Sequence, residues 1–328
     1  MNRRWICSDV WMDILPSFKR VELGLKMALL SDRYDVLVDA HFDGKSELTI
    51  WRWIEIRKHI LPEPELSVRI DGKWVEFPLP DHSLPNKIRF NHLWIEYIDH
   101  SVIEFLRANK QIWDKSGTKL ELFMSSIESF VQQHIWDVFV HQIWPIFATN
   151  IRHFGFCNGT HLDNLRRRIS PTLLTDLDQL KSIDSRLLFP DGIADNGPNA
   201  SSGQALTKWL HTPSKNGQSK RLFCADFNKE EDLDWINNFK EAFLRATTSV
   251  SYKIRLELYE STPIEPFESV NERTKEKLTL LLVEEDGYAL TKWLLKRCPI
   301  SEKAAAIQWE NDENWDNNLN NVQFNLLE

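Results

Sequence analysis

The sequence predicts an α/β protein in which a short helical segment precedes a long series of alternating strands and helices. Two observations predict this class. Apolar residues recur at helical spacing over residues 8–42, and after residue 45 β-rich segments begin roughly every 30 residues with helical stretches between them. A third observation is composition, because 328 residues with 42% hydrophobic content are enough to bury a large core.

The first expected helix lies in "SDVWMDILPSF". Its apolar residues fall on one side of a helix, and Ser8 precedes them as the expected N-cap. Pro16 lacks an amide hydrogen and clashes with the preceding turn, so we expect the helix to end or kink near Leu15.

The second expected helix, "VELGLKMALL", is apolar on two faces, and a third helix opens at Ser31. A unit of about 35 residues does not normally bury enough surface to fold alone. Its apolar surface therefore packs entirely on the following sheet, or one face of it is offered to a second protein. Periodicity alone leaves both alternatives open.

The region after residue 45 predicts a parallel sheet. "SELTIWRWIEI" is strand-like, and Asp71-Gly72 between alternating residues predicts a two-residue hairpin. Further strands are expected to begin at Leu93, Leu120, Ile151, Leu180, Arg221 and Tyr252. Strands joined by helical crossovers form parallel sheets, so we expect an irregular leucine-rich-repeat-like α/β solenoid, with a doubly wound sheet as the alternative.

The C-terminal segment predicts an end cap. It contains a second Asp-Gly hairpin at Asp286 and Gly287, a helix-like stretch at 302–310 and a last strand, "VQFNLL". We expect an antiparallel edge that covers the final repeat and prevents pairing with another chain. The predicted architecture is thus a three-helix module at 1–45 and a repeat-like domain at 46–328, with antiparallel hairpins at its ends.

Charge and cysteine usage exclude several classes of protein. A net charge of -8 argues against a nucleic-acid partner, and the basic cluster at 166–168 is interpreted as a solvated helix face. No apolar run approaches the roughly 18 residues of a membrane span, and Asp9 and Asp13 interrupt the region where a signal peptide would be apolar. Scattered cysteines without disulfide or metal-ligand spacing favour reduced thiols in the cytoplasm or nucleus.

No catalytic or metal-binding motif is present. The sequence lacks G-x-G-x-x-G, G-x-S-x-G and H-E-x-x-H, so no enzyme activity, cofactor or metal is expected. His134, Asp137 and His141 share part of a helix face and are interpreted as polar rim residues. The tryptophans lie mostly within apolar stripes, which predicts core packing.

The segment "ICSDVWMDILPSFKRVELGLKMALLSDRYDVLVDAHF" resembles an F-box, the three-helix module that docks onto the Skp-type adaptor of cullin ubiquitin ligases. The resemblance is carried by Ile6, Asp9, Val10, Ile14, Leu15, Glu22, Leu23, Leu30, Ser31, Arg33, Tyr34, Leu37 and Val38. Three positions depart from the pattern: Cys7 replaces the usual proline, Tyr34 is an aromatic residue in place of the common tryptophan, and Pro16 interrupts the first helix. "SSGQALTKWLHTP" and "LLKRCPISEKAAAIQWENDENW" also resemble sequences of a family of F-box-bearing proteins of plant-parasitic nematodes.

The resemblance implies a non-catalytic substrate-recognition subunit of a Skp-cullin-F-box type ubiquitin ligase. One end would bind the Skp-type adaptor and the rest would bind a protein client for ubiquitin transfer. The expected adaptor-binding residues are Val10, Ile14, Leu15, Phe18, Leu23, Met27, Leu30 and Tyr34. The alternative is an interaction scaffold or secreted effector whose N-terminal helices are only a structural cap.

Strand alternation predicts the client-binding face. In "LELFM" and "KIRLEL" the leucines and Ile254 point one way, so the residues between them point the other way. The expected client-binding residues are Glu121, Phe123, Phe154, Phe223, Arg255 and Glu257. The competing interpretation is that helices cover both faces of a parallel sheet.

Overall fold

The chain forms two compact α/β units. In the computed structural model, the first unit comprises Met1–Thr118, Gln142–Phe147 and Asn318–Glu328, and the second comprises Lys119–His141 and Ala148–Asn317. Each has an open sheet of mixed strand direction, which confirms the predicted α/β class. The structure describes residues 7–326 apart from 19–22, 24–26, 44–48, 52–53, 58–64, 71–72, 81–82, 85–87, 91, 125–129, 216, 226–233, 260–263, 287–289 and 302–318.

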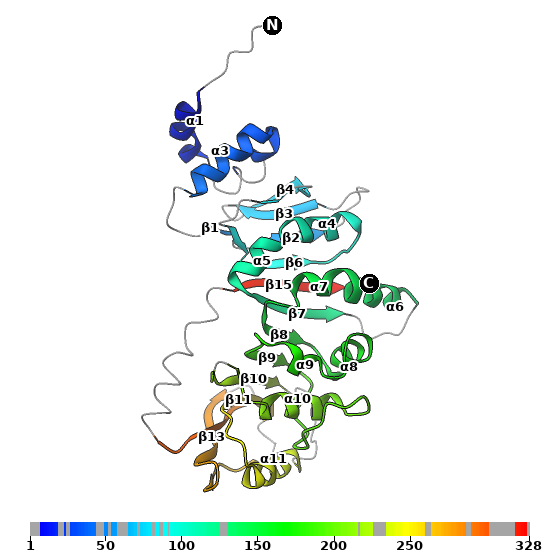
Figure 1. The fold of residues 1–328 in the computed structure, drawn as a ribbon, viewed down its shortest axis with the longest axis vertical. Coiled ribbons are helices and arrows are strands. Elements are labelled where there is room, and N and C mark those ends of the chain that lie inside the picture. Colours follow the sequence, from blue (N-terminus) through cyan, green and yellow to red (C-terminus); the bar gives the residue numbers. More distant parts are fainter. Residues whose placement is uncertain are drawn as a thin grey trace. The chain divides into compact units, whose positions relative to one another are not determined.

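The first unit begins with the N-terminal helical module, drawn in blue in Figure 1. Its described elements are α1 (Ser8–Ile14), the 3₁₀ turns η1 (Leu15–Ser17) and η3 (Ala28–Leu30), and α3 (Asp32–Asp43). The α-helix ends at Ile14 and gives way to a turn that contains Pro16, as expected from the missing amide hydrogen. The N-cap prediction was wrong, because Cys7 is the capping residue and Ser8 is the first helical residue. Most of the second expected helix lies outside the described residues.

The module has a small hydrophobic core of its own. Its buried residues are Leu15, Leu23, Ala28, Leu37 and Val38, with Trp11, Met27 and Tyr34 packed partly buried against them. The rings of Trp11 and Tyr34 meet edge to face at 5.0 Å, which joins α1 to α3. The division of the chain at residue 45 remains a prediction.

The sheet of the first unit has the order β15-β6-β2-β3-β4. Its strands are β2 (Ile54–Arg57), β3 (Glu65–Ile70), β4 (Lys73–Pro78), β6 (Leu93–Ile95) and β15 (Asn320–Leu326), and β1 (Thr49–Trp51) pairs separately with β5 (Ile88–Phe90). β3 and β4 pair antiparallel with Ile70 opposite Lys73, which confirms the first hairpin.

The last strand was placed wrongly by the sequence. β15 does not extend the C-terminal cap but pairs in parallel with β6, with Val322 opposite Leu93. The reason is burial: Val322 and Phe324 are both fully buried. The Phe324 ring lies 6.3 Å from that of Phe147, which in turn contacts Trp113 at 5.4 Å. The C-terminal strand therefore completes the core of the first unit.

The helices of the first unit are α4 (His100–Ala108), α5 (Lys110–Ser116) and α7 (Trp144–Phe147). Asn109, between α4 and α5, is fully buried. Its amide accepts a hydrogen bond from the Leu84 backbone at 2.7 Å and donates one to the Phe105 carbonyl at 2.8 Å. Because both polar ends are satisfied, this buried amide holds the helix junction in one geometry.

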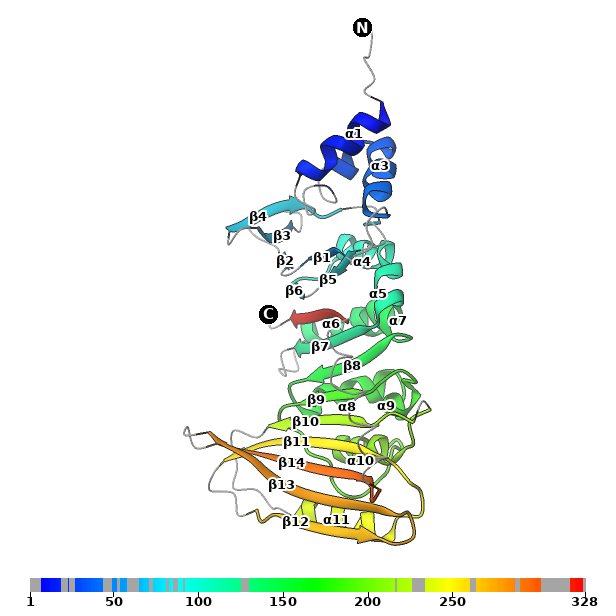
Figure 2. The same ribbon diagram turned by 90° about the vertical axis from the view of Figure 1, so that its left-hand side faces the viewer.

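The sheet of the second unit has the order β7-β8-β9-β10-β11-β14-β13-β12. Its strands are β7 (Thr118–Met124), β8 (Ile151–Phe156), β9 (Ser182–Ser185), β10 (Lys220–Ala225), β11 (Tyr252–Tyr259), β12 (Phe267–Asn271), β13 (Glu276–Asp286) and β14 (Leu290–Pro299). Strands β8 to β11 are parallel and in chain order, as Figure 2 shows. β14, β13 and β12 follow antiparallel, which confirms the second hairpin and the antiparallel edge. The helix-like stretch at 302–310 lies outside the described residues.

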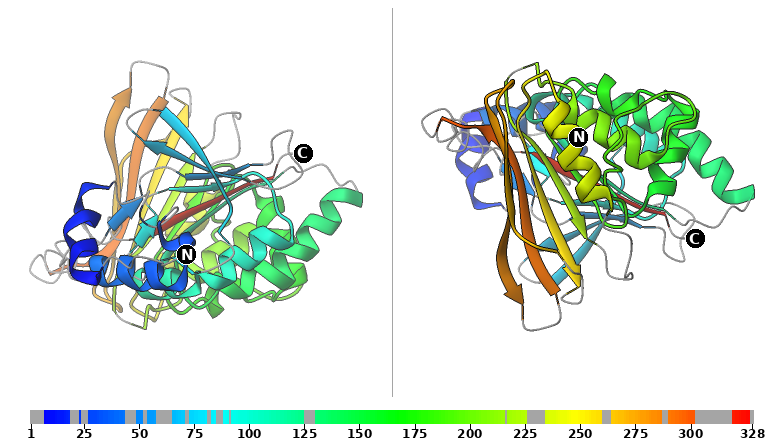
Figure 3. Two further views of the ribbon diagram at one scale, coloured as in Figure 1. Left: turned by 90° about the horizontal axis from the view of Figure 1, so that it is seen from above. Right: turned by 90° about the horizontal axis from the view of Figure 1, so that it is seen from below.

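The described helices of the second unit lie on one face of its sheet (Figure 3). They are α6 (Phe130–Val138), the π-helical turn η4 (Phe139–Ile143), α8 (Gly159–Arg168), α9 (Leu173–Asp176), α10 (Ser202–His211) and α11 (Asp234–Arg245). Trp136, Trp209 and Trp293 are buried, which confirms their predicted core role. Among the residues that the structure describes, no helix is both long and apolar enough to cross a bilayer.

A buried ion pair joins the antiparallel strands β13 and β14 of this unit. Arg297 and Glu276 have side chains that are each 1% exposed, and the guanidinium donates to Glu276 Oε2 from Nε and from NH2 at 3.1 and 2.7 Å. Glu276 Oε1 also accepts from the Val250 backbone and from Ser249 Oγ. Because the buried charges are paired with each other and Glu276 also accepts from residues 249 and 250, the pair links β13 and β14 to the segment before β11.

Candidate functional site

The first candidate site is the face of the second unit's sheet opposite its described helices, which we call the open face. In the ladder from β9 to β11, Ile183, Leu222 and Ile254 lie in register on the helix-covered face and are buried. Asp184, Phe223 and Arg255 lie in register on the open face. The predicted alternation is therefore confirmed: the leucines of β7 and β11 are buried, and the residues between them point to the open face.

Five of the six expected client-binding residues lie on the open face, and one does not. Glu121, Phe123, Phe223 and Glu257 are half-buried, and Arg255 is exposed. The prediction for Phe154 was wrong, because Phe154 is opposite Ile183 in the ladder and is fully buried under the helices. Gly155, one residue further on, occupies the open-face position opposite Asp184. A strand register one residue out of phase moves a side chain to the other face.

An arginine side chain makes a cation–π contact with each of two phenylalanine rings on the open face, Phe123 and Phe223. The Arg186 guanidinium lies 5.4 Å from the centroid of the Phe123 ring, and that of Arg255 lies 5.6 Å from the Phe223 ring. Arg255 also pairs with Glu257 at 2.9 Å. Such partly exposed cation–π contacts are worth about 0.5–1 kcal/mol each. The open face thus presents phenylalanine and arginine side chains, which are residue types enriched at protein interfaces.

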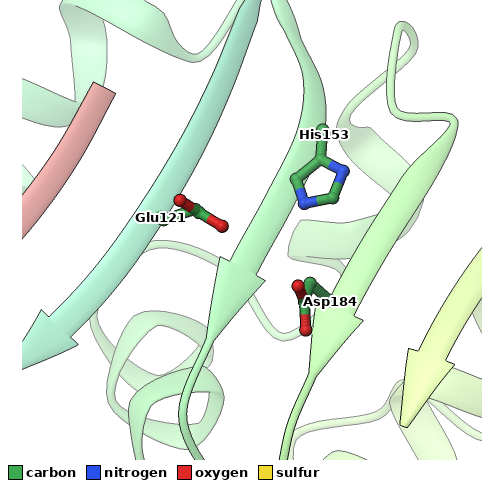
Figure 4. A group of neighbouring side chains, drawn as sticks. All are labelled: Glu121, His153 and Asp184. Carbon is green, nitrogen blue, oxygen red and sulfur yellow. The ribbon is translucent and has the colours of Figure 1, made fainter. Parts of the chain in front are cut away.

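A compact polar cluster lies at one end of the open face (Figure 4). Glu121 of β7, His153 of β8 and Asp184 of β9 bring one ligand atom each within 4.8 Å of the others. In the part of the chain that the structure describes, this is the one such group of three or more histidine, cysteine or acidic residues. Gly155 makes room for it, because a Cβ at that position would lie 2.9 Å from Glu121 Cγ.

Burial shifts the protonation equilibria within this cluster. Loss of solvation, with a smaller contribution from the Lys119 ammonium, lowers the pKa of His153 to about 3. Burial, followed by repulsion from Glu121, raises the pKa of Asp184, while Lys119 and Arg186 oppose that rise. Lys119 pairs with Glu121 at 3.2 Å. His153 is consequently a neutral imidazole at neutral pH, with a lone pair on one ring nitrogen.

Sequence reasoning missed this cluster. Its members lie on three successive strands and have no local spacing that a motif search detects. The available signal was the strand phase, since Glu121 was already predicted to point to this face. Extending the same alternation to β8 with the correct register would have placed His153 beside it.

The second candidate site is the exposed apolar surface of the N-terminal module. Of the expected adaptor-binding residues, Val10, Phe18 and Leu30 are 44, 38 and 64% exposed. Met12 and Val36, which sequence reasoning did not select, are also exposed. We call these five residues the apolar surface of the module.

The remaining expected adaptor-binding residues lie deeper. Leu15 and Leu23 are fully buried in the module core, so they support the surface instead of forming it. This corrects their expected role, because a fully buried side chain does not contact a partner without local unfolding. Ile14, Met27 and Tyr34 are partly buried. Leu23 and Met27, the two expected adaptor-binding residues from the second helix, thus contribute to the module core, and residues 24–26 between them lie outside the described residues.

A hollow of about 590 Å³ beside α8 is a further concave feature of the second unit, and Asp163, Arg166 and Pro198 are among its lining residues. The solvated-face interpretation was wrong for Arg166, which is 5% exposed and donates to the carbonyls of Pro171, Ala200 and Gly197. Its guanidinium holds a loop against α8. Because the guanidinium already donates to three backbone carbonyls, we interpret Arg166 as a residue that stabilises the fold.

The other polar residues considered in the sequence are the histidine and aspartate residues of the 134–141 segment and the cysteines. His134, Asp137 and His141 are exposed, and Asp137 pairs with Arg168. All four cysteines are free thiols. Burial raises the pKa of Cys224 and Cys298, which lowers the fraction of each thiol present as thiolate.

Comparison with known proteins gives no relative of this chain: no family model, curated protein or solved structure matches it.

Proposed function

We propose that this chain is a non-catalytic substrate-recognition subunit of a Skp-cullin-F-box type ubiquitin ligase. Its N-terminal module binds a Skp-type adaptor, and a leucine-rich-repeat-like domain behind it binds a protein client, in the cytoplasm or nucleus. The observation that carries the proposal is the apolar surface of the module: Val10, Met12, Phe18, Leu30 and Val36 are exposed, although the described part of the module also has a buried core, formed by Leu15, Leu23, Ala28, Leu37 and Val38.

The module is too short to bury a large apolar area by itself. Apolar surface removed from water contributes about 25 cal/mol per Å², and the five core residues among the described part of the module supply little of it. Covering five exposed apolar side chains with another protein adds burial that the chain itself does not provide. A docking partner would therefore stabilise the module as well as bind it. The F-box-like pattern over the same residues is what points to a Skp-type adaptor as that partner.

A binding titration of the full chain with a purified Skp-type adaptor tests this proposal. We expect saturable binding that falls at least about tenfold in Leu30→Asp and in Val10→Asp, because a charge in an apolar contact is left desolvated and unpaired. Val270→Asp is the matched control, since Val270 is an exposed valine of the second unit and its change should leave affinity unaltered. A folded parent chain that binds no adaptor would leave the N-terminal helices as a structural cap.

The open face supports the client-binding half of the proposal. β8 to β11 follow one another in parallel with helices on one face, the arrangement of strands and helices in α/β solenoids. Solenoids use an exposed strand surface to bind extended partners, and Phe123, Phe223 and Arg255 supply aromatic and charged contacts there.

Photo-crosslinking tests the client-binding half. A crosslinking residue placed at Phe223 should capture a client in cells that express the chain, whereas one placed at Phe154, which is buried beneath the helices, should capture none. Equal capture from both positions would remove the open face as the client site.

A further inference from the structure

We propose that Glu121, His153 and Asp184 form a binding site for one divalent transition-metal cation, with Zn²⁺ as the best-fitting ion. The site goes beyond the proposed ligase role, and its test does not depend on adaptor or client binding. Two carboxylate oxygens and one imidazole nitrogen converge from three neighbouring strands of a single unit (Figure 4).

The three ligand atoms lie close enough together to bind one metal ion after small rotations of their side chains. The three atoms lie within 4.8 Å of one another. Ligand atoms that share a tetrahedral zinc at about 2.0–2.2 Å lie roughly 3.4 Å apart. Side-chain rotations that move each atom by about 1 Å close this difference, and the strands themselves need not move. Three protein ligands leave a fourth position for water or another donor.

The unpaired polar atoms of the cluster are the second, independent observation. His153 is 8% exposed, and neither its Nε2 nor Asp184 Oδ1 has a hydrogen-bond partner among the described residues. Leaving a buried polar atom unsatisfied costs about 1–3 kcal/mol. Figure 4 shows the imidazole directed into the space that it shares with the two carboxylates. A cation there would satisfy both orphaned atoms at once.

The charge balance admits a divalent cation. Glu121 and Asp184 supply two negative charges, and a neutral imidazole adds none. Lys119 pairs with Glu121 Oε1 at 3.2 Å, which leaves Oε2 as the second oxygen of that carboxylate. Lys119 is 31% exposed, so its ammonium can turn toward solvent when a metal binds. Lys119 and Arg186 lower the affinity but leave the ligand set intact.

The ligand types select the class of metal. Imidazole nitrogen with carboxylate oxygen suits zinc and neighbouring transition metals better than Mg²⁺ or Ca²⁺, which prefer sites built wholly from oxygen. Cys157 is close enough to interact electrostatically with Asp184 and Glu121, but its sulfur is not part of the group. A cobalt-substituted site should therefore lack sulfur coordination.

Calorimetric titration of the full chain with ZnCl₂ tests the proposal. We expect one equivalent to bind per chain, and we expect affinity to fall at least about tenfold in His153→Gln and in Asp184→Asn. Glu268→Gln is the matched control, because Glu268 is a half-exposed carboxylate of the same unit. Its change removes the same charge and should leave zinc affinity as in the parent. Circular dichroism checks that each variant is folded.

Gly155→Ala is the sharpest variant, because it removes no ligand. Its Cβ would displace the flexible Glu121 side chain, 2.9 Å away at Cγ, and we expect zinc affinity to fall while the fold persists. If His153→Gln and Asp184→Asn bind zinc like the parent, or if Gly155→Ala is folded and binds zinc unchanged, the proposed site is wrong. A thiolate charge-transfer band in the cobalt-substituted parent would also overturn it.

Discussion

The N-terminal module and the second unit differ in how completely each covers its apolar surface. The second unit packs one face of its sheet under its described helices, and its buried charges at Arg297 and Glu276 pair with each other. Among its described residues, the module has five buried core residues and five exposed apolar ones. The second unit thus buries its apolar residues beneath its own helices, whereas the module leaves apolar side chains exposed.

The largest effect is expected from Glu276→Ala in the second unit. Removing one member of a buried ion pair leaves Arg297 desolvated and unpaired, at a cost of about 3–5 kcal/mol. Chemical unfolding of the full chain measures the loss. The matched control is Glu272→Ala, since Glu272 makes an exposed pair with Lys275 that is worth about 0–1 kcal/mol. Equal losses from the two variants would show that the buried pair does not stabilise this end of the sheet.

Leu15→Ala should lower the stability of the module by about 2–4 kcal/mol, because Leu15 is fully buried and its truncation opens a cavity in the module core. Leu30→Ala, at a 64% exposed position, should change it by less than about 0.5 kcal/mol. Hydrogen exchange of the amides in α1 and α3 measures both changes. A similar loss from both would mean that Leu30 is part of the core and not of the surface.

The pH dependence of the second unit should depend in part on His211. Its ring lies near those of Phe239 and Tyr252, at 5.3 and 5.9 Å. Burial, followed by the positive charges of Arg297, Lys220 and Lys208, lowers its pKa to about 4. The unfolded chain binds a proton at this residue from about pH 6.5, so stability is present above that pH and is lost as pH falls toward 4.

His211→Phe keeps a ring in this position and removes the titration. Between pH 7 and pH 4.5 the parent should lose about 2 kcal/mol more stability than this variant. Denaturant unfolding at both pH values measures the difference, and His134→Gln, at an exposed histidine, should follow the parent. Parallel profiles for the parent and His211→Phe would contradict the assignment.

The smallest effect is expected on the open face. Arg255→Ala removes one partly exposed ion pair and one cation–π contact and should cost less than about 1 kcal/mol. Thermal unfolding measures it. A loss of several kcal/mol would mean that Arg255 supports the fold, which would weaken its assignment to a binding surface.

Local patterns predicted most elements of the fold. The Asp-Gly hairpins, the strands at Leu93, Ile151 and Tyr252, and the end of α1 before Pro16 all follow from residues close in sequence. The predictions that were wrong concerned features set by residues far away in the sequence. β15 inserts beside β6 because Phe324 fits a core near Phe147 and Trp113, and nothing in "VQFNLL" specifies that neighbour.

The residues of the candidate sites were likewise predicted correctly only where local sequence patterns determine their positions. Alternation placed Phe123, Phe223 and Arg255 on the open face, because period two is a local property of a strand. It failed for Phe154, whose phase is set by pairing with β9. Burial within the module likewise depends on contacts between helices, so Leu15 and Leu23 could not be separated from Val10 and Leu30 by spacing alone.

Hydrogen exchange of the full chain with and without a Skp-type adaptor tests the central claim most directly. We predict slower exchange in Ser8–Ser17 and Ala28–Asp43 upon addition of adaptor, with β8 to β11 unchanged. Protection of the second unit without any change in the N-terminal helices, or no protection at a saturating concentration of adaptor, would contradict the account.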